Sequence, residues 1–148
     1  MKLSATLFFV LGVLLISTNC KEKANQESQV KETEEWISLF NGEDLNDWII
    51  KVKGYPLGEN PMNTFSAKEG IMKVSYKDYD TFNDQFGHIF YKTPYSSYKF
   101  RVDYRFIGNQ VPGGAGWAER NSGIMVHSQS PESMGLNQDF PLSIEVQM

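Results

Sequence analysis

The sequence of 148 residues contains one cysteine, Cys20, and two histidines, His88 and His127. A single cysteine cannot form a disulfide within the chain, so no disulfide framework supports the fold. The two histidines lie far apart in the sequence, and no cluster of cysteine or aspartate stands beside either one. A recognisable zinc site needs such a cluster. The sequence therefore predicts no cofactor and no recognisable zinc site, and it leaves a requirement for a divalent metal open.

The sequence also lacks an excess of positive charge, since its net charge is -4 and its pI is about 5.2. Binding to nucleic acid calls for a basic patch, so we expect no nucleic-acid partner. No phosphate-binding glycine loop, dinucleotide fingerprint or Ser-His-Asp order is present. Aromatic residues, in contrast, make up 14% of the chain. They favour β-strands and provide flat surfaces on which sugars or bases stack.

The apolar run at residues 7–16 is ten residues long, which is too short to span a bilayer of about 30 Å. It follows a positive start at Met1-Lys2 and ends just before Cys20, the layout of a secretory signal. A lone cysteine at the cleavage position resembles a bacterial lipoprotein signal, in which that cysteine is lipidated. A plain secretory peptide is the alternative. Residues 21–35 contain almost no large apolar side chain and are expected to form a disordered tether from an envelope membrane.

From Trp36 onward, short β-like runs alternate with loops rich in Gly, Pro and Asn. The clearest run is YKFRVDYRF at residues 98–106, where apolar and charged residues alternate without a break, as in an antiparallel sheet. A hairpin is expected around Lys68-Glu69-Gly70. Further strands are expected at residues 37–40, 64–66, 71–76, 87–92, 123–129 and 142–148. No stretch has a sustained helical period, so the sequence predicts an all-β sandwich or barrel.

Four motifs carry a family resemblance: LFNGEDLNDW, SAKEGIMKV, YSSYKFRVDYRF and RNSGIMVHSQ…IEVQ, in that order between residues 36 and 148. Together they resemble the 3-keto-disaccharide hydrolase-like family. The resemblance implies a concanavalin A-like jelly-roll sandwich of antiparallel strands, often in lipoproteins and secreted proteins of bacteria. Domains of the family continue past the EVQ strand, so we expect a C-terminally truncated domain. An unpaired apolar strand at residues 142–148 would leave it only marginally stable.

The two last expected strands carry the candidate catalytic residues. In residues 142–148, Glu145 and Gln147 lie on the face opposite the apolar one, and in residues 123–129 His127 lies on the polar face. If these strands are neighbours, Glu145 and His127 meet on one surface, because paired residues sit about 5 Å apart. Arg120 and Asn121 stand at the rim of that surface.

Other polar and aromatic residues receive more modest roles. Trp117 follows a glycine-rich loop and is either a stacking platform or packed at the sheet edge. Arg105 belongs to a charge ladder with Arg101 and Asp103 and borders the expected sugar site. His88 is interpreted as a partly buried strand histidine without a catalytic role.

The resemblance implies cleavage of glycosides that carry a ketone at carbon 3. The ketone acidifies the C2 hydrogen, so a base, Glu145 or His127, can remove it while the C1 substituent leaves. Arg120 and Asn121 would hold the enolate oxygen or the hydroxyls, with Gln147, Trp117 and Arg105 as further binding residues. Two alternatives stay open: a two-carboxylate glycosidase that uses Asp139 as its second carboxylate, and a non-catalytic lectin-like module.

Overall fold

The computed structural model describes residues 35–148 of the chain. The expected signal segment, its Cys20 and the tether up to residue 34 lie outside the described residues. Within residues 35–148, no helix is long and apolar enough to cross a membrane. The elements below all belong to one unit, Trp36–Met148.

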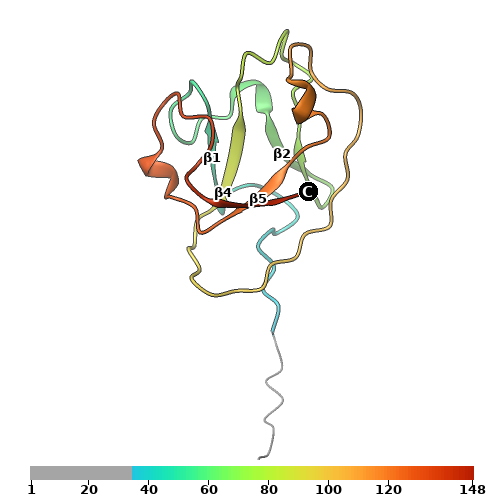
Figure 1. The fold of residues 1–148 in the computed structure, drawn as a ribbon. Helices are drawn as coiled ribbons and strands as arrows, with labels where there is room; N and C mark the ends of the chain where they lie inside the picture. The colour runs from blue at the N-terminus through green and yellow to red at the C-terminus, as the bar shows by residue number, and fades with distance from the viewer. Residues whose placement is uncertain (1–34) are drawn as a thin grey trace, which may run out of the picture. The chain divides into compact units, whose positions relative to one another are not determined.

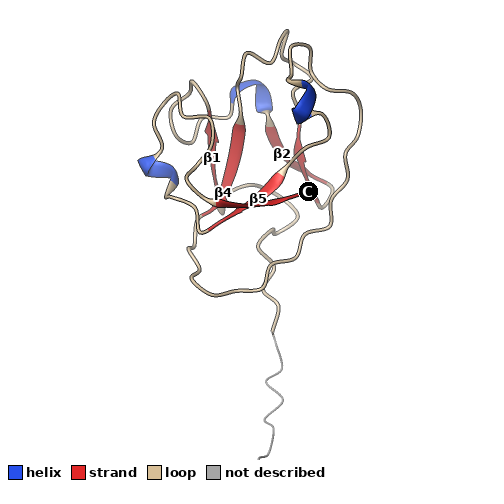
Figure 2. Cartoon of the chain, in the orientation of Figure 1, coloured by secondary structure: helices blue, strands red, loops and turns tan. Residues whose placement is uncertain are grey.

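Six strands form three antiparallel pairs, which Figure 2 shows in red among long loops. The all-β prediction is therefore confirmed. The pairs are β1 (Trp48–Val52) with β4 (Gly87–Tyr91), β2 (Phe65–Lys68) with β3 (Ile71–Val74), and β5 (Gly123–Val126) with β6 (Ile144–Gln147). Three short 3-10 helices lie in the loops: η1 (Pro61–Asn63), η2 (Gly116–Ala118) and η3 (Pro131–Ser133).

The β2–β3 hairpin forms where the turn residues predicted it. Glu69 and Gly70 both have positive φ, 53° and 75°. Two successive positive φ angles give the turn whose twist matches the flanking strands, and glycine adopts such an angle without strain. The expected hairpin is confirmed.

The core lies between the β1–β4 and β2–β3 pairs. Ile50, Val52 and Phe65 are buried there. Leu45, Tyr55 and Ile89 pack against them. Strand β1 is not among the strands predicted from the sequence. The β-branched residues of its WIIKV sequence are the signal that identifies it.

Gly87, the first residue of β4, lets the two strand pairs approach closely. A Cβ atom at this position would lie 3.0 Å from the Phe65 ring and 3.1 Å from the Tyr76 hydroxyl. That hydroxyl donates a hydrogen bond to the Gln85 carbonyl at 3.0 Å. Burial, together with the neighbouring Tyr79, raises the pKa of Tyr76 to about 12. The absence of a side chain at Gly87 is therefore part of the core packing.

Two predicted strands are absent from the described chain. Residues 37–40 form no strand, and residues 98–106, the clearest alternating run, form none either. Both sets of alternating side chains in residues 98–106 are exposed, including Tyr98, Phe100 and Val102. The prediction was wrong because alternating side chains separate an apolar face from a polar face but do not provide a neighbouring strand. A strand also needs a hydrogen-bonded neighbour, and no described strand lies in register with this segment.

The last two expected strands are neighbours, which the sequence left as a condition, and both are shorter than expected. Strand β5 ends at Val126 because His127 has φ 50°, a left-handed conformation that interrupts a ladder. Figure 1 draws the β5–β6 pair across the β1–β4 pair, and residues 92–115 run around the outside as a long loop.

Candidate functional site

Lys51 is a buried cation in the middle of β1, with only 2% of its surface exposed. Its Nζ donates hydrogen bonds to three backbone carbonyl oxygens, those of Val52, Tyr55 and Leu136, at 3.0–3.1 Å. These acceptors use all three hydrogens of the ammonium group. Burial lowers the pKa of Lys51. This positive charge is thus fixed in place inside the domain.

His88 is the antiparallel partner of Lys51 in the β1–β4 register. Its Nε2 lies 2.7 Å from the Asp139 carbonyl oxygen. Because a carbonyl oxygen only accepts, Nε2 carries the hydrogen of the neutral ring and Nδ1 is left as a bare acceptor. Burial lowers the pKa of His88, and Lys51 lowers it further. The Asp139 carbonyl and the Glu145 carboxylate oppose that shift by raising it. The imidazole is therefore held neutral beside a carboxylate.

A loop that ends at Phe140 is attached to β1 and β4 at several points. Besides the bond from Lys51, the Leu136 carbonyl accepts one from the Gly54 amide at 2.9 Å. Lys53 Nζ lies 2.6 Å from Asp139 Oδ1. These contacts place the Phe140 ring against His88, with 5.7 Å between ring centroids. The loop thus closes one side of the His88 ring with an aromatic wall.

Glu145 lies on β6 opposite Met125. Its side chain covers Gly123, where a Cβ atom would fall 2.0 Å from Glu145 Oε1. The carboxylate is also close enough to His88 to shift the pKa of that ring. A glycine on the neighbouring strand therefore makes room for the carboxylate in this position, and any side chain there would displace it.

His127, the predicted partner of Glu145, lies in a different environment. Its positive φ turns it out of the β5 alternation, and its ring faces Tyr98 with centroids 6.3 Å apart. Among the described side chains, no hydrogen bond or ring contact joins it to Glu145. The Glu145 carboxylate instead influences His88, the histidine without a predicted catalytic role, by raising the pKa of its ring. A signal was available, since Lys51 and His88 are the polar residues of two otherwise apolar strands.

Three predicted binding residues form one connected group. The Trp117 carbonyl accepts a hydrogen bond from Asn121 Nδ2 at 2.7 Å, and Asn121 Oδ1 accepts one from Gln147 Nε2. Gln147 Nε2 also donates to the Ser122 carbonyl at 2.9 Å. The Trp117 ring stacks on Phe86 at 5.9 Å and 15°, yet 61% of the residue is exposed. The group therefore presents a broad aromatic face to solvent.

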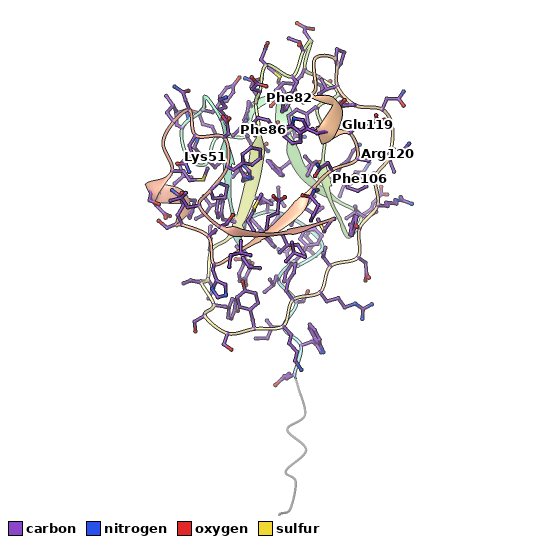
Figure 3. The ribbon with its side chains drawn as sticks, viewed as in Figure 1. Lys51, Phe82, Phe86, Phe106, Glu119 and Arg120 are labelled. Atoms are coloured by element: carbon purple, nitrogen blue, oxygen red, sulfur yellow. The ribbon has the colours of Figure 1, made fainter. Side chains whose placement is uncertain are left out.

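The two predicted arginines lie outside this group. Arg120 is exposed, with φ 49°, and in the view of Figure 3 Phe86 lies between it and Lys51. Arg105 is exposed within residues 98–106, the segment that forms no strand. In the described residues, no group of three or more His, Cys, Asp or Glu side chains is arranged to hold a metal ion.

The fold and the site define an antiparallel all-β domain with an exposed tryptophan ring on its surface. The family assignment is more specific. A family model described as the 3-keto-alpha-glucoside-1,2-lyase-like domain matches residues 35–148, and the chain belongs to this family. The domain is thus of the concanavalin A-like type expected, with a glycoside-related function. No curated protein and no solved structure is significantly similar to the chain.

Proposed function

We propose that the domain cleaves the glycosidic bond of 3-keto-glycosides by elimination, with Glu145 as the base. The observation that carries the proposal is the position of the Glu145 carboxylate, which lies over Gly123 and close to the neutral ring of His88. A carboxylate that makes no ion pair in the described structure keeps its lone pairs for proton abstraction. The family description, which names a 1,2-lyase-like domain, agrees with this chemistry.

In the proposed step, a Glu145 oxygen takes the hydrogen from C2, which the neighbouring ketone acidifies. The C2–H electron pair forms a C1–C2 double bond as the bond between C1 and the leaving oxygen breaks. The leaving oxygen takes up a proton from an acid, and water then adds across the double bond to complete hydrolysis. His88 carries a bare Nδ1, so it is suited to receive the proton from Glu145 afterwards.

Substrate binding in this proposal uses the residues around the Trp117 platform. One face of a sugar ring would stack on the Trp117 ring. The Asn121 amide holds the Trp117 backbone through its carbonyl, and Gln147 donates a hydrogen bond to Asn121. Arg120 and Arg105 stay predictions as groups that reach the sugar from the exposed side. His127 stays a prediction as an alternative base.

The decisive experiment compares three variants of the full-length protein. Glu145→Gln keeps the shape of the side chain but removes its basicity, so turnover of a 3-keto-glucoside should fall about 10²–10⁴-fold while binding persists. Gly123→Ala should also lower turnover, because the new methyl group displaces the carboxylate. Gly116→Ala is the matched control, since its Cβ meets nothing within 4 Å and turnover should be unchanged.

Full turnover in Glu145→Gln would remove Glu145 from the mechanism. If the parent protein binds sugar but turns over no 3-keto-glucoside, the lectin-like alternative replaces the proposal. A direct glycosidase would instead require Asp139, whose carboxylate is engaged by Lys53 at 2.6 Å. That third mechanism would be favoured if the parent protein cleaves an unoxidised glucoside and the Asp139→Asn variant loses this turnover.

We also propose that the protein acts at the bacterial envelope, held to a membrane by a lipid on Cys20. The short apolar segment that ends at the single cysteine of the chain supports this proposal. A stable anchor of this kind needs more than one acyl chain. Cys20→Ser should move the protein from the membrane fraction to the soluble fraction, and unchanged membrane association would contradict the proposal.

A further inference from the structure

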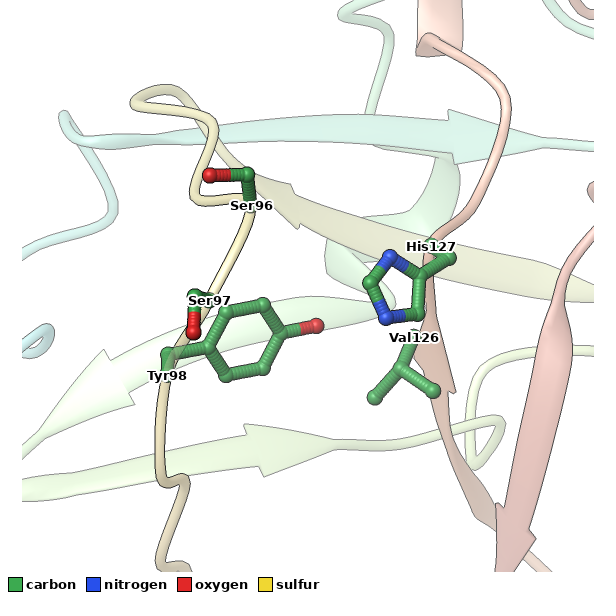
Figure 4. A pocket seen from close by; sticks show the side chains of 5 residues that line it. All are labelled: Ser96, Ser97, Tyr98, Val126 and His127. Atoms are coloured by element: carbon green, nitrogen blue, oxygen red, sulfur yellow. The ribbon is translucent and has the colours of Figure 1, made fainter.

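A second hollow lies at the end of β5, lined by Ser96, Ser97, Tyr98, Val126 and His127 (Figure 4). Its volume is about 310 Å³ and it is open to solvent. The Tyr98 hydroxyl points toward the His127 ring across the hollow (Figure 4). This volume is at the lower end of the range for small-molecule sites, so the hollow suits a ligand of about one ring.

The position of Val126 separates this hollow from the candidate active site. Side chains alternate along a strand, so Val126 points to the face opposite Met125, and Met125 is the partner of Glu145. His127 joins Val126 in the hollow because its positive φ breaks the alternation. The two histidines of the chain therefore serve two separate places, His88 beside Glu145 and His127 beside Tyr98.

The chemistry of the hollow points to an uncharged, hydroxyl-rich ring. Its lining combines one aromatic ring, one imidazole, two serine hydroxyls and the apolar Val126, with no carboxylate, lysine or arginine. A pyranose has apolar C–H faces that stack on an aromatic ring and hydroxyls that exchange hydrogen bonds with serine, tyrosine and histidine. A charged ligand such as a phosphate would find no lysine or arginine in the lining.

We propose that this hollow, the Tyr98–His127 pocket, is a second carbohydrate site that binds one neutral pyranose unit without cleaving it. The site goes beyond the proposed function, since it requires neither Glu145 nor a ketone on the sugar. It would hold one unit of a glycan on the protein while the Glu145 site acts on another bond. His127 then contributes hydrogen bonds to the sugar and takes no proton from it.

The test is a titration of the full-length protein with methyl α-glucopyranoside, followed by NMR of the imidazole C–H signals. Only two histidines are present, so His88→Gln and His127→Gln assign the signals. The His127 signals should move and saturate. Tyr98→Ala should weaken that binding about two- to twelvefold, the range expected for an aromatic contact. Tyr104→Ala, an exposed aromatic residue outside the pocket, is the matched control and should not weaken it.

Three outcomes would overturn the proposed carbohydrate site. In the first, the His127 signals shift without saturating, and in the second, the Tyr98→Ala variant binds the probe with the parental affinity. The third is a His127→Asn variant that loses turnover but keeps its affinity for the probe. The last result would instead give His127 the role of base. Binding at His127 that persists in Glu145→Gln supports the pocket even if no glycoside is cleaved. The test therefore fails independently of the proposed function.

Discussion

Phe65 and Phe100 both occupy alternating positions in β-like runs, but 2% of Phe65 is exposed against 42% of Phe100. Phe65 belongs to β2, which pairs with β3, and its ring packs at Gly87 of β4. Phe100 lies in residues 98–106, which pair with no described strand. The same contrast separates the β1–β4 and β2–β3 region, where the core lies, from β6, where all four residues are exposed.

This difference shows that hydrophobic alternation is not sufficient for burial. An apolar face is buried only when a second element covers it, and that element must come from elsewhere in the chain. Leu45, Tyr55 and Ile89 pack against the buried cluster that contains Phe65 and supply this cover. Around Phe100, none of the described elements does.

The largest expected effect tests the contrast directly. Phe65→Ala should reduce the free energy of unfolding by about 3–5 kcal/mol, because it removes a buried ring and leaves a cavity. Phe100→Ala should change it by no more than about 0.5 kcal/mol, as at other exposed positions. Denaturant unfolding of both variants measures the difference. Equal losses would show that residues 98–106 are buried in solution.

A second, smaller effect concerns the buried cation of the first region. Lys51→Met removes the donor to three carbonyl oxygens, and buried acceptors left without a donor should cost about 1–3 kcal/mol. Lys73, exposed on β3, is the matched control, and Lys73→Met should have almost no effect. Thermal unfolding of the two variants compares them. A Lys51→Met variant as stable as the parent would show that water replaces these bonds.

The smallest effect concerns His88 and the pH dependence of the free energy of unfolding. The folded-state pKa of His88 is lowered from its usual 6.5, so the unfolded chain binds this proton at a higher pH than the folded one. The stabilisation is present above pH 6.5 and is lost as pH falls from 6.5 through the folded-state pKa. His88→Gln should flatten this slope in the free energy of unfolding.

The neighbours of His88 sharpen the experiment, since Glu145 raises its pKa and Lys51 lowers it. In NMR titrations, Glu145→Gln should therefore lower the pKa of His88 and Lys51→Met should raise it. If neither substitution moves it, the Lys51, His88 and Glu145 side chains are not neighbours in solution.

Much of the fold and part of the site were predictable from local signals. The Glu69-Gly70 turn predicted the β2–β3 hairpin, and the alternation around Glu145 predicted the polar face of β6, the strand that pairs with β5. The connection between Asn121 and Gln147 follows from that pairing. His88 was missed because its position as a polar residue in an apolar strand does not show which residues it meets. Its significance comes from Lys51 and Glu145, which are distant in sequence.

The sequence by itself determined the all-β class, the β2–β3 hairpin and the family, because turn residues, alternation and ordered motifs are local properties of the chain. The pairing of β5 with β6 came from the tertiary structure. Only the tertiary structure decided which histidine accompanies Glu145. Alternation tells which residues of one strand share a face, but it does not tell which faces of different strand pairs meet. The contacts of Lys51 with a loop 85 residues away and the single positive φ of His127 made that choice.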